Sequence, residues 1–223
     1  MHNIYIAGTG IWHPEEKVSN IELVNSYNSF VEKFNHENKL EIENGSLEAM
    51  ELSSAEFIEK ASGIKSRYVI DKEGILDINR MMPRVKNEHP DRLSIHAEVG
   101  IKAAKKAMDQ ANVRPNEIDA VIVGTSHAAR NYPAVAIEIQ QELGISGYGY
   151  DMLVGCSSTT FAINNAYSDI ASGLANTILV INPEVSTPFV NFSHRDKHFI
   201  FGDGCAATVV QKNSESDKAF KII

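Results

Sequence analysis

The chain has 223 residues, 43% hydrophobic and 22% charged, a composition typical of a globular protein with a sizeable core. Its 21 basic and 29 acidic residues give a formal net charge of -8 with no basic block, which disfavours nucleic acid as a partner. No apolar run approaches the roughly 20 residues that a membrane helix needs, and the first residues show no secretion signal. We therefore expect a cytoplasmic protein that does not bind membranes.

The first third of the chain predicts a strand and two capped helices. Asn3–Gly8 is apolar and short, as in a buried strand. Ser19–Glu22 has the S-x-x-E form of a capping box, so a helix should begin near Asn20, and Ser53–Glu56 repeats that form. The polar stretch between these two helices, residues 32–51, predicts a solvated helical or loop insertion with a turn at Asn44-Gly45.

From Ser94 onward, strands and helices alternate, and this alternation predicts a layered α/β fold with a parallel core. Small and branched residues recur at helical spacing from Ile95 to Ala111, and Gly144 is placed to end a later helix. The other expected elements are strands at 120–123, 148–154, 177–181 and 207–210, helices at 135–143 and 157–172, a strand at 198–201 and a turn at Gly202-Asp203-Gly204.

The usual cofactor and metal motifs are missing. Gly8-Thr9-Gly10 follows a strand as a dinucleotide loop would, but the position of the third glycine is His13, and Pro14 follows it. The eight histidines include no HExxH pair, and His194 and His198 have no carboxylate that would complete a site. Two cysteines are too few for a zinc site made of cysteines alone, so we expect no metal and no resident cofactor.

Cys156 is the residue with the clearest chemical context. It closes an apolar strand and opens a helix, in the run Leu153-Val154-Gly155-Cys156-Ser157. Unpaired N–H groups and the positive end of the helix dipole favour a thiolate at that place, and the same N–H groups suit an oxyanion. A strand-end cysteine is also often a small buried hydrophobe, and close packing is the best interpretation of Cys205.

The wider sequence resembles β-ketoacyl-acyl-carrier-protein synthase III of the thiolase superfamily. The resemblance rests on motifs in a fixed order: Gly8-Thr9-Gly10 with Pro14, Ser62-Gly63-Ile64 with Arg67, Cys156, and Phe201-Gly202-Asp203-Gly204. It extends over nearly the whole chain. Each motif alone is weak, and their joint order and spacing carry the resemblance.

The resemblance implies a thiolase-like fold, a layered α/β/α arrangement with a mixed sheet. A buried central helix would follow the nucleophile, and the apolar residues spread around 160–170 fit such a helix. Residues 1–212 would form the amino-terminal domain, with a polar insertion at about 25–52. Residues 213–223 would begin a second, related half that is missing.

The implied reaction is a decarboxylative Claisen condensation in fatty acid biosynthesis. Cys156 would take an acyl group from acyl-CoA, and the enolate formed from malonyl-ACP would attack this acyl-enzyme to give β-ketoacyl-ACP. Acyl-CoA is then a substrate rather than a cofactor, the acyl carrier protein is a partner, and the full-length protein would be a homodimer.

The resemblance also assigns substrate-binding residues. Arg195 matches an arginine that contacts the CoA nucleotide, Phe57 stands where many members have a tryptophan that stacks on it, and Ala61 stands where some have a second arginine. Phe201, Ile200 and Ser186 match residues that line the acyl pocket, and Tyr132 matches an aromatic residue that reaches into the partner's pocket. Plain packing is the alternative for Arg195, Phe57, Phe201, Ile200, Ser186 and Tyr132.

One departure affects the functional expectation. The family holds the thioester enolate with a histidine and an asparagine from its second half, and none of the 67 residues after Cys156 (223 − 156) shows those motifs. The chain is therefore expected to be a fragment whose own activity is open. The alternatives are another thioester-condensing enzyme of specialised metabolism, and a non-catalytic fragment or partner subunit.

Overall fold

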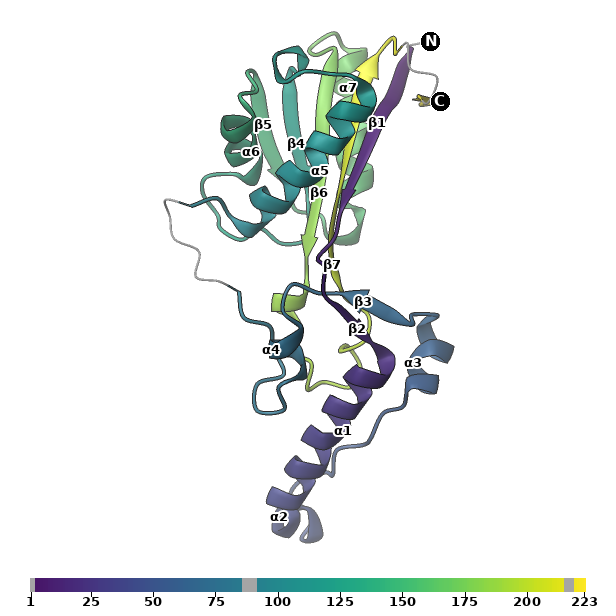
Figure 1. The fold of residues 1–223 in the computed structure, drawn as a ribbon, viewed down its shortest axis with the longest axis vertical. Coiled ribbons are helices and arrows are strands. Elements are labelled where there is room, and N and C mark those ends of the chain that lie inside the picture. The colour runs from purple at the N-terminus through teal and green to yellow at the C-terminus, as the bar shows by residue number, and fades with distance from the viewer. Residues whose placement is uncertain (1–2, 86–91, 215–218) are drawn as a thin grey trace. The chain divides into compact units, whose positions relative to one another are not determined.

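The computed structural model describes residues 3–85, 92–214 and 219–223, and its chain forms two compact units (Figure 1). Unit 1 comprises Met1–His13, Asn87–Val185 and Gly204–Ile223, and unit 2 comprises Pro14–Lys86 and Ser186–Asp203. The assignment of 1–212 to a single domain, and of 213–223 to the start of another half, stays a prediction.

Unit 1 is built on a six-stranded mixed sheet. The strand order is β5-β4-β6-β7-β1-β8, in which β4 pairs in parallel with β5 and β6, and β1 pairs antiparallel with β7 and β8. The strands are β1 (Ile4–Trp12), β4 (Ala120–Gly124), β5 (Tyr148–Met152), β6 (Thr177–Val185), β7 (Asp203–Lys212) and β8 (Phe220–Lys221).

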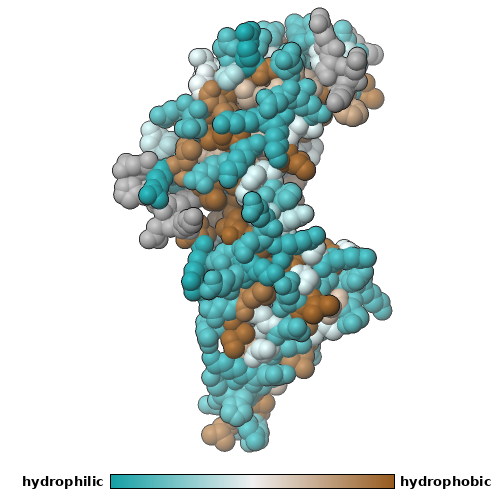
Figure 2. All heavy atoms as spheres, viewed as in Figure 1, coloured by the Kyte–Doolittle hydropathy of each residue, from teal (hydrophilic) through white to brown (hydrophobic). Residues whose placement is uncertain are grey.

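Helices cover both faces of this sheet, so the predicted α/β/α layering with a mixed sheet is confirmed. Helices α5 (Ile95–Ala111) and α6 (Val135–Leu143) pack on one face, where a side chain at Gly100 would meet Ile139 of α6 and Ile181 of β6. Helix α7 (Ser158–Ala171) packs on the other face, against Ile122 and Ile178 among others. Figure 1 shows α5 crossing the sheet in front, and Figure 2 shows mainly hydrophilic residues along its outer side.

The expected burial of the helix after Cys156 is met on one face only. Helix α7 buries Ser158, Ala162, Ala166 and Ile170 against the sheet, and these residues share one helical face at a spacing of four. Phe161 lies outside this face and is 50% exposed. A helix that is apolar on several sides therefore has one apolar side in contact with solvent here.

The glycines of Gly8-Thr9-Gly10 lie inside β1 and not in a loop. A Cβ at Gly8 would lie 2.6 Å from the backbone nitrogen of Ala111, and one at Gly10 would lie 2.6 Å from that of Ala107. The motif thus lets α5 approach the sheet closely. This packing role gives a physical reason for the motif that requires no dinucleotide.

Unit 2 is a helical unit with a two-stranded sheet. It contains β2 (Lys17–Ser19) paired with β3 (Ser66–Tyr68), and the helices α1 (Asn20–Glu37), α2 (Lys39–Glu43), α3 (Ala55–Ser62) and α4 (Lys72–Leu76). The predicted capping box at Ser19 and Glu22 is confirmed. The second one is displaced, because Ser54 and not Ser53 caps α3 through the N–H of Phe57.

The insertion is more structured than its polar composition suggests. Helix α1 continues to Glu37 and buries Tyr27 and Val31 in the core of unit 2. The second helix, α2, buries none of its residues, as expected for a solvated segment. The turn at Asn44-Gly45 is confirmed, with Gly45 at φ +78.

Two local predictions near residue 200 are wrong. Residues 198–200 form turns and Phe201 is irregular, so no strand forms there, and β7 begins at Asp203, inside the sequence expected to form the Gly-Asp-Gly turn. The buried Asp203 carboxylate explains the motif, since it accepts from the backbone N–H groups of Ile70 and Thr187, both at 2.9 Å, and from the Thr187 hydroxyl at 2.6 Å. Burial raises the pKa of Asp203.

Candidate active site

Cys156 lies in a 3-10 turn, Gly155–Ser157, that leads directly from the end of β5 into α7. The predicted strand 148–154 ends at Met152, which leaves Leu153 and Val154 as a short connection. Gly155 adopts φ +59, a left-handed conformation that favours glycine. Cys156 itself is exposed, so the alternative of a small buried hydrophobe is wrong for this cysteine.

Cys205 has the opposite setting. It is 6% exposed within β7, and burial raises the pKa of its thiol to about 12. Very little of it is a thiolate near neutral pH, and the thiolate is the nucleophile. The close-packing interpretation of Cys205 agrees with this burial, and Cys156 is the accessible thiol of the two.

The surface around the Cys156 turn is partly apolar. Leu153 and Val154 precede it and are 55% and 45% exposed, and Phe161 lies one helical turn into α7. The exposed residues Thr159 and Thr160 add polar groups to this face of α7. Such a surface suits contact with an acyl chain or with further protein.

Two of the predicted CoA-contacting residues meet in unit 2. The guanidinium carbon of Arg195 lies 4.9 Å from the centre of the Phe57 ring, which is a cation–π contact. Phe57 in turn packs edge-on against Phe199. Residues 138 positions apart in the sequence (195 − 57) thus form a flat aromatic and guanidinium pair, the kind of surface on which a base stacks.

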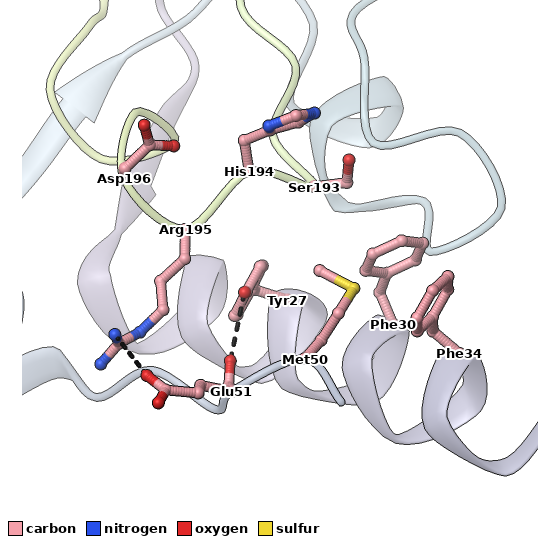
Figure 3. Close-up of a pocket in the computed structure, with 9 residues that line it drawn as sticks. All are labelled: Tyr27, Phe30, Phe34, Met50, Glu51, Ser193, His194, Arg195 and Asp196. Atoms are coloured by element: carbon pink, nitrogen blue, oxygen red, sulfur yellow. Dashed lines mark hydrogen bonds and ion pairs between the residues drawn. The ribbon is translucent and has the colours of Figure 1, made fainter. Parts of the chain in front are cut away.

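Sequence reasoning missed the third member of this group. Nη1 of Arg195 lies 3.0 Å from a carboxylate oxygen of Glu51, whose side chain is 79% exposed (Figure 3). The backbone carbonyl of the same residue accepts a hydrogen bond from Tyr27 at 3.2 Å. Ala61 is exposed on α3 and brings no charge. A lone glutamate in a polar insertion carries no sequence signal of such a contact.

Glu51 and Arg195 also border a cavity of about 520 Å³ within unit 2. Figure 3 shows aromatic side chains of α1 on one side of it, and Ser193, His194, Arg195 and Asp196 around the other sides. Tyr27, Phe30 and Phe34 are spaced by three and four residues, a helical spacing that would have indicated this wall in the sequence. The full lining is Tyr27, Phe30, Phe34, Met50, Glu51, Ser193, His194, Arg195 and Asp196.

The predicted acyl-pocket residues of unit 2 lie near its carboxyl-terminal loop. Ile200 and Phe201 are 49% and 41% exposed, and Ser186 is half-buried at the start of a 3-10 turn, Thr187–Phe189. Arg67 holds this loop, since its guanidinium donates to the carbonyl of Phe199 at 3.3 Å. The structure brings Arg195 and Phe57 together directly.

Tyr132 belongs to unit 1 and lies on the connection between β4 and α6. It precedes Pro133 through a cis peptide bond and is 87% exposed. The connection is anchored by a partly buried ion pair between Arg130 and Glu138 at 2.7 Å. Within this chain, therefore, Tyr132 is presented outward and takes no part in the core.

His198 is a buried histidine of unit 2. His198 is fully buried, stacks on Tyr27 with ring centres 4.8 Å apart, and burial lowers its pKa. Over residues 3–85, 92–214 and 219–223, no three His, Cys, Asp or Glu side chains are grouped to bind a metal ion. In the same ranges, no helix has the length and hydropathy to cross a bilayer.

Comparison with known proteins connects this geometry to a family. The family described as 3-oxoacyl-[acyl-carrier-protein (ACP)] synthase III matches residues 150–223, which include the Cys156 turn. A β-ketodecanoyl-[acyl-carrier-protein] synthase of Pseudomonas aeruginosa is 50% identical over 84% of this chain and 53% of its own length. A β-ketoacyl-[acyl-carrier-protein] synthase III of Ehrlichia canis is 31% identical over 74% of this chain and 46% of its own length.

Solved structures agree with the sequence matches. The priming β-ketosynthase of the R1128 polyketide pathway superposes with a TM-score of 0.71 at 25% identity, over 96% of this chain and 51% of its own. The 3-oxoacyl-[acyl-carrier-protein] synthase III of Aquifex aeolicus gives 0.70 at 26% identity, over 96% and 55%. This chain spans about half the length of these relatives. Within that span, its sequence and its thiolase-like fold place it in the 3-oxoacyl-[acyl-carrier-protein] synthase III family.

Proposed function

We propose that the protein is an acyltransferase that condenses an acyl-CoA with malonyl-ACP through an acyl-Cys156 intermediate. The observation that supports this most is the exposed Cys156 in the turn that opens α7, within the segment that matches the family. The other cysteine is buried with a raised pKa and offers no competing nucleophile.

The proposed reaction has two steps. The Cys156 thiolate attacks the thioester carbonyl of acyl-CoA, and the CoA thiolate leaves. Malonyl-ACP then loses carbon dioxide, and the resulting enolate carbon attacks the carbonyl of the acyl-enzyme. The C–S bond to Cys156 breaks, so that β-ketoacyl-ACP leaves and the thiolate is regenerated.

The proposed acyl group has eight carbons. The relative that is 50% identical is named for a β-ketodecanoyl product. A ten-carbon product minus the two carbons that malonyl-ACP retains after decarboxylation leaves an octanoyl group on the cysteine. We place Phe201, Ile200 and Ser186 beside this chain, and Tyr132 in the acyl pocket of a second copy in a homodimer.

The proposed CoA contact is the pair of Arg195 and Phe57. A base could stack on the exposed side of either member, and the guanidinium carries the charge that a phosphate requires. We further propose that the acyl carrier protein docks on the whole protein and that the reaction takes place in the cytoplasm.

A labelling experiment tests the nucleophile. Incubation with radiolabelled octanoyl-CoA should label Cys156 stoichiometrically, Cys156→Ala should abolish the label, and Cys205→Ala should retain it. Label that remains in Cys156→Ala and disappears in Cys205→Ala would refute the assignment. Comparing acyl-CoA substrates of different lengths in the same assay tests the preference for eight carbons.

Condensation makes a stricter demand than acylation. Negative charge develops on the malonyl thioester oxygen during decarboxylation, and losing one donor to such an oxygen costs about 10²–10³ in rate. The histidine and asparagine that the resemblance assigns to this task are not among residues 157–223. The 223-residue chain is therefore expected to accept an acyl group without forming detectable β-ketoacyl-ACP, and turnover that depends on Cys156 would contradict this.

A second candidate is a thioester-condensing enzyme of specialised metabolism. It is favoured by the structural match to a priming β-ketosynthase of a polyketide pathway at 25% identity. Supplying malonyl-ACP from fatty acid synthesis and alternative carrier-bound acceptors to the acylated full-length protein separates the two candidates.

A further inference from the structure

We propose that Ser158 is the positioning residue of the Cys156 turn, which it fastens to the end of β4. This inference rests on the proposed role of Cys156 and concerns a residue two positions further along. Ser158 is the first residue of α7 and is 1% exposed, so its hydroxyl lies in the interior of unit 1.

The Ser158 hydroxyl makes contacts on both sides of the nucleophile. Its oxygen accepts a hydrogen bond from the backbone N–H of Val154 at 3.0 Å. The carbonyl oxygens of Gly155 and Thr125 lie 2.8 and 3.0 Å away, as acceptors for its proton. Gly155 belongs to the cysteine turn itself, so Thr125 is the acceptor through which the hydroxyl reaches the end of β4.

Thr125 is a fixed point for this purpose. It directly follows β4, is fully buried, and its N–H donates to the carbonyl of Met152 in β5 at 3.1 Å. Its own hydroxyl lies 2.6 Å from the carbonyl of Pro183 in β6. One residue therefore joins the ends of three strands, and Ser158 connects the cysteine turn to it.

The backbone is also shaped for this contact. A Cβ at Gly124 would lie 2.8 Å from the carbonyl oxygen of Ser158 and 2.9 Å from the side-chain Nδ2 of Asn182. Only a glycine at the end of β4 lets the start of α7 come this close. The hydroxyl and the glycine are separate features that place the Cys156 turn on the same strand end.

Without this connection, the turn is held mainly by its own hydrogen bonds. Within it, the N–H of Ser157 donates to the carbonyl of Val154 at 3.4 Å, and the N–H of Ser158 donates to the carbonyl of Gly155. A hydrogen bond of 3.4 Å is weak. A thiol on a looser turn spends less time at the helix N-terminus, where backbone N–H groups favour its attack.

The test compares Ser158→Thr with Ser158→Val, two side chains of nearly the same shape that differ in the hydroxyl. Both fill the site equally, so any general disturbance of folding is shared. Ser157→Ala is a matched control at an exposed neighbour whose side chain makes no capping bond to α7. The readouts are the rate of Cys156 alkylation by iodoacetamide, followed by intact mass, and amide hydrogen exchange at Val154.

We expect iodoacetamide to alkylate Cys156 roughly tenfold more slowly in Ser158→Val than in Ser158→Thr. We also expect the Val154 amide hydrogen to exchange roughly tenfold faster in Ser158→Val. Ser158→Thr and Ser157→Ala should stay close to the unmodified protein. Equal alkylation and equal exchange in Ser158→Val and Ser158→Thr would overturn the proposal. Alkylation needs no acyl-CoA, so a failure of octanoyl labelling would refute the proposed function and leave this inference standing.

Discussion

Replacing Gly10 by alanine should destabilise unit 1, because the backbone of α5 occupies the space that a side chain needs. The added Cβ would lie 2.6 Å from the nitrogen of Ala107 and 2.8 Å from the Cβ of Lys106, and the carbonyl oxygen of Ala103 is closer still. Two of these three atoms belong to the helix backbone, so no side-chain rotation can relieve the contact.

The size of the effect follows from the required movement. An ordinary contact begins at 3.4 Å, so α5 must withdraw from β1 by at least 0.8 Å (3.4 − 2.6) at Ala107. Overpacking of this kind costs about 1–3 kcal/mol. Replacing glycine by alanine also lowers the conformational entropy of the unfolded chain, which stabilises the folded state by about 0.4–1 kcal/mol. We therefore expect a net loss of about 1.3 kcal/mol.

Gly204 provides the matched control. It lies in β7, next to the residue that pairs with Trp12 of β1, and its nearest neighbour for a Cβ is the carbonyl oxygen of Trp12 at 3.5 Å. Gly204→Ala should be neutral, or stabilising by up to about 1 kcal/mol. Urea unfolding followed by far-UV circular dichroism measures both variants. Equal midpoints for Gly10→Ala and Gly204→Ala would refute the view that the Gly8-Thr9-Gly10 motif serves the packing of α5.

Three further predictions concern charges in unit 2. The pKa of Glu22 is lowered from 4.5 to about 2, and the hydrogen bond from Lys72 is the largest cause. The ionised Glu22 carboxylate therefore stabilises the folded state above about pH 4.5, and this stabilisation is lost as the pH falls toward 2. Glu22→Gln should thus lower the free energy of unfolding by at most about 1 kcal/mol at pH 7, because the pair is partly exposed, with no difference near pH 2 in pH-dependent urea titrations. Glu51→Gln frees Arg195 from an exposed ion pair and should tighten CoA binding in calorimetry by up to about fivefold, whereas weaker binding would show that the carboxylate assists the ligand. Arg195→Ala should raise the KM for acyl-CoA more than that for malonyl-ACP in the full-length protein, and equal effects would remove Arg195 from the CoA site.

Local signals in the sequence were sufficient for helix ends. The capping box at Ser19 and the left-handed Gly144 after Leu143 were both predictable, because the hydrogen bonds and backbone angles that form these caps involve only neighbouring residues. The same holds for Cys156, whose place between a strand and a helix is a local pattern. The error of one residue at Ser54 shows the limit, since two adjacent serines offer the same cap.

Contacts between distant segments were decided only by the tertiary structure. Glu51 meets Arg195 across 144 positions (195 − 51), and Ser158 meets Thr125 across 33, separations at which a pairing leaves no periodic or compositional trace. The role of Gly10 likewise depends on where α5 packs. Sequence alone determines which residues can cap, turn or attack, because that chemistry belongs to the residue and its neighbours. Which of them meet depends on how helices and strands pack, and packing is a property of the whole core.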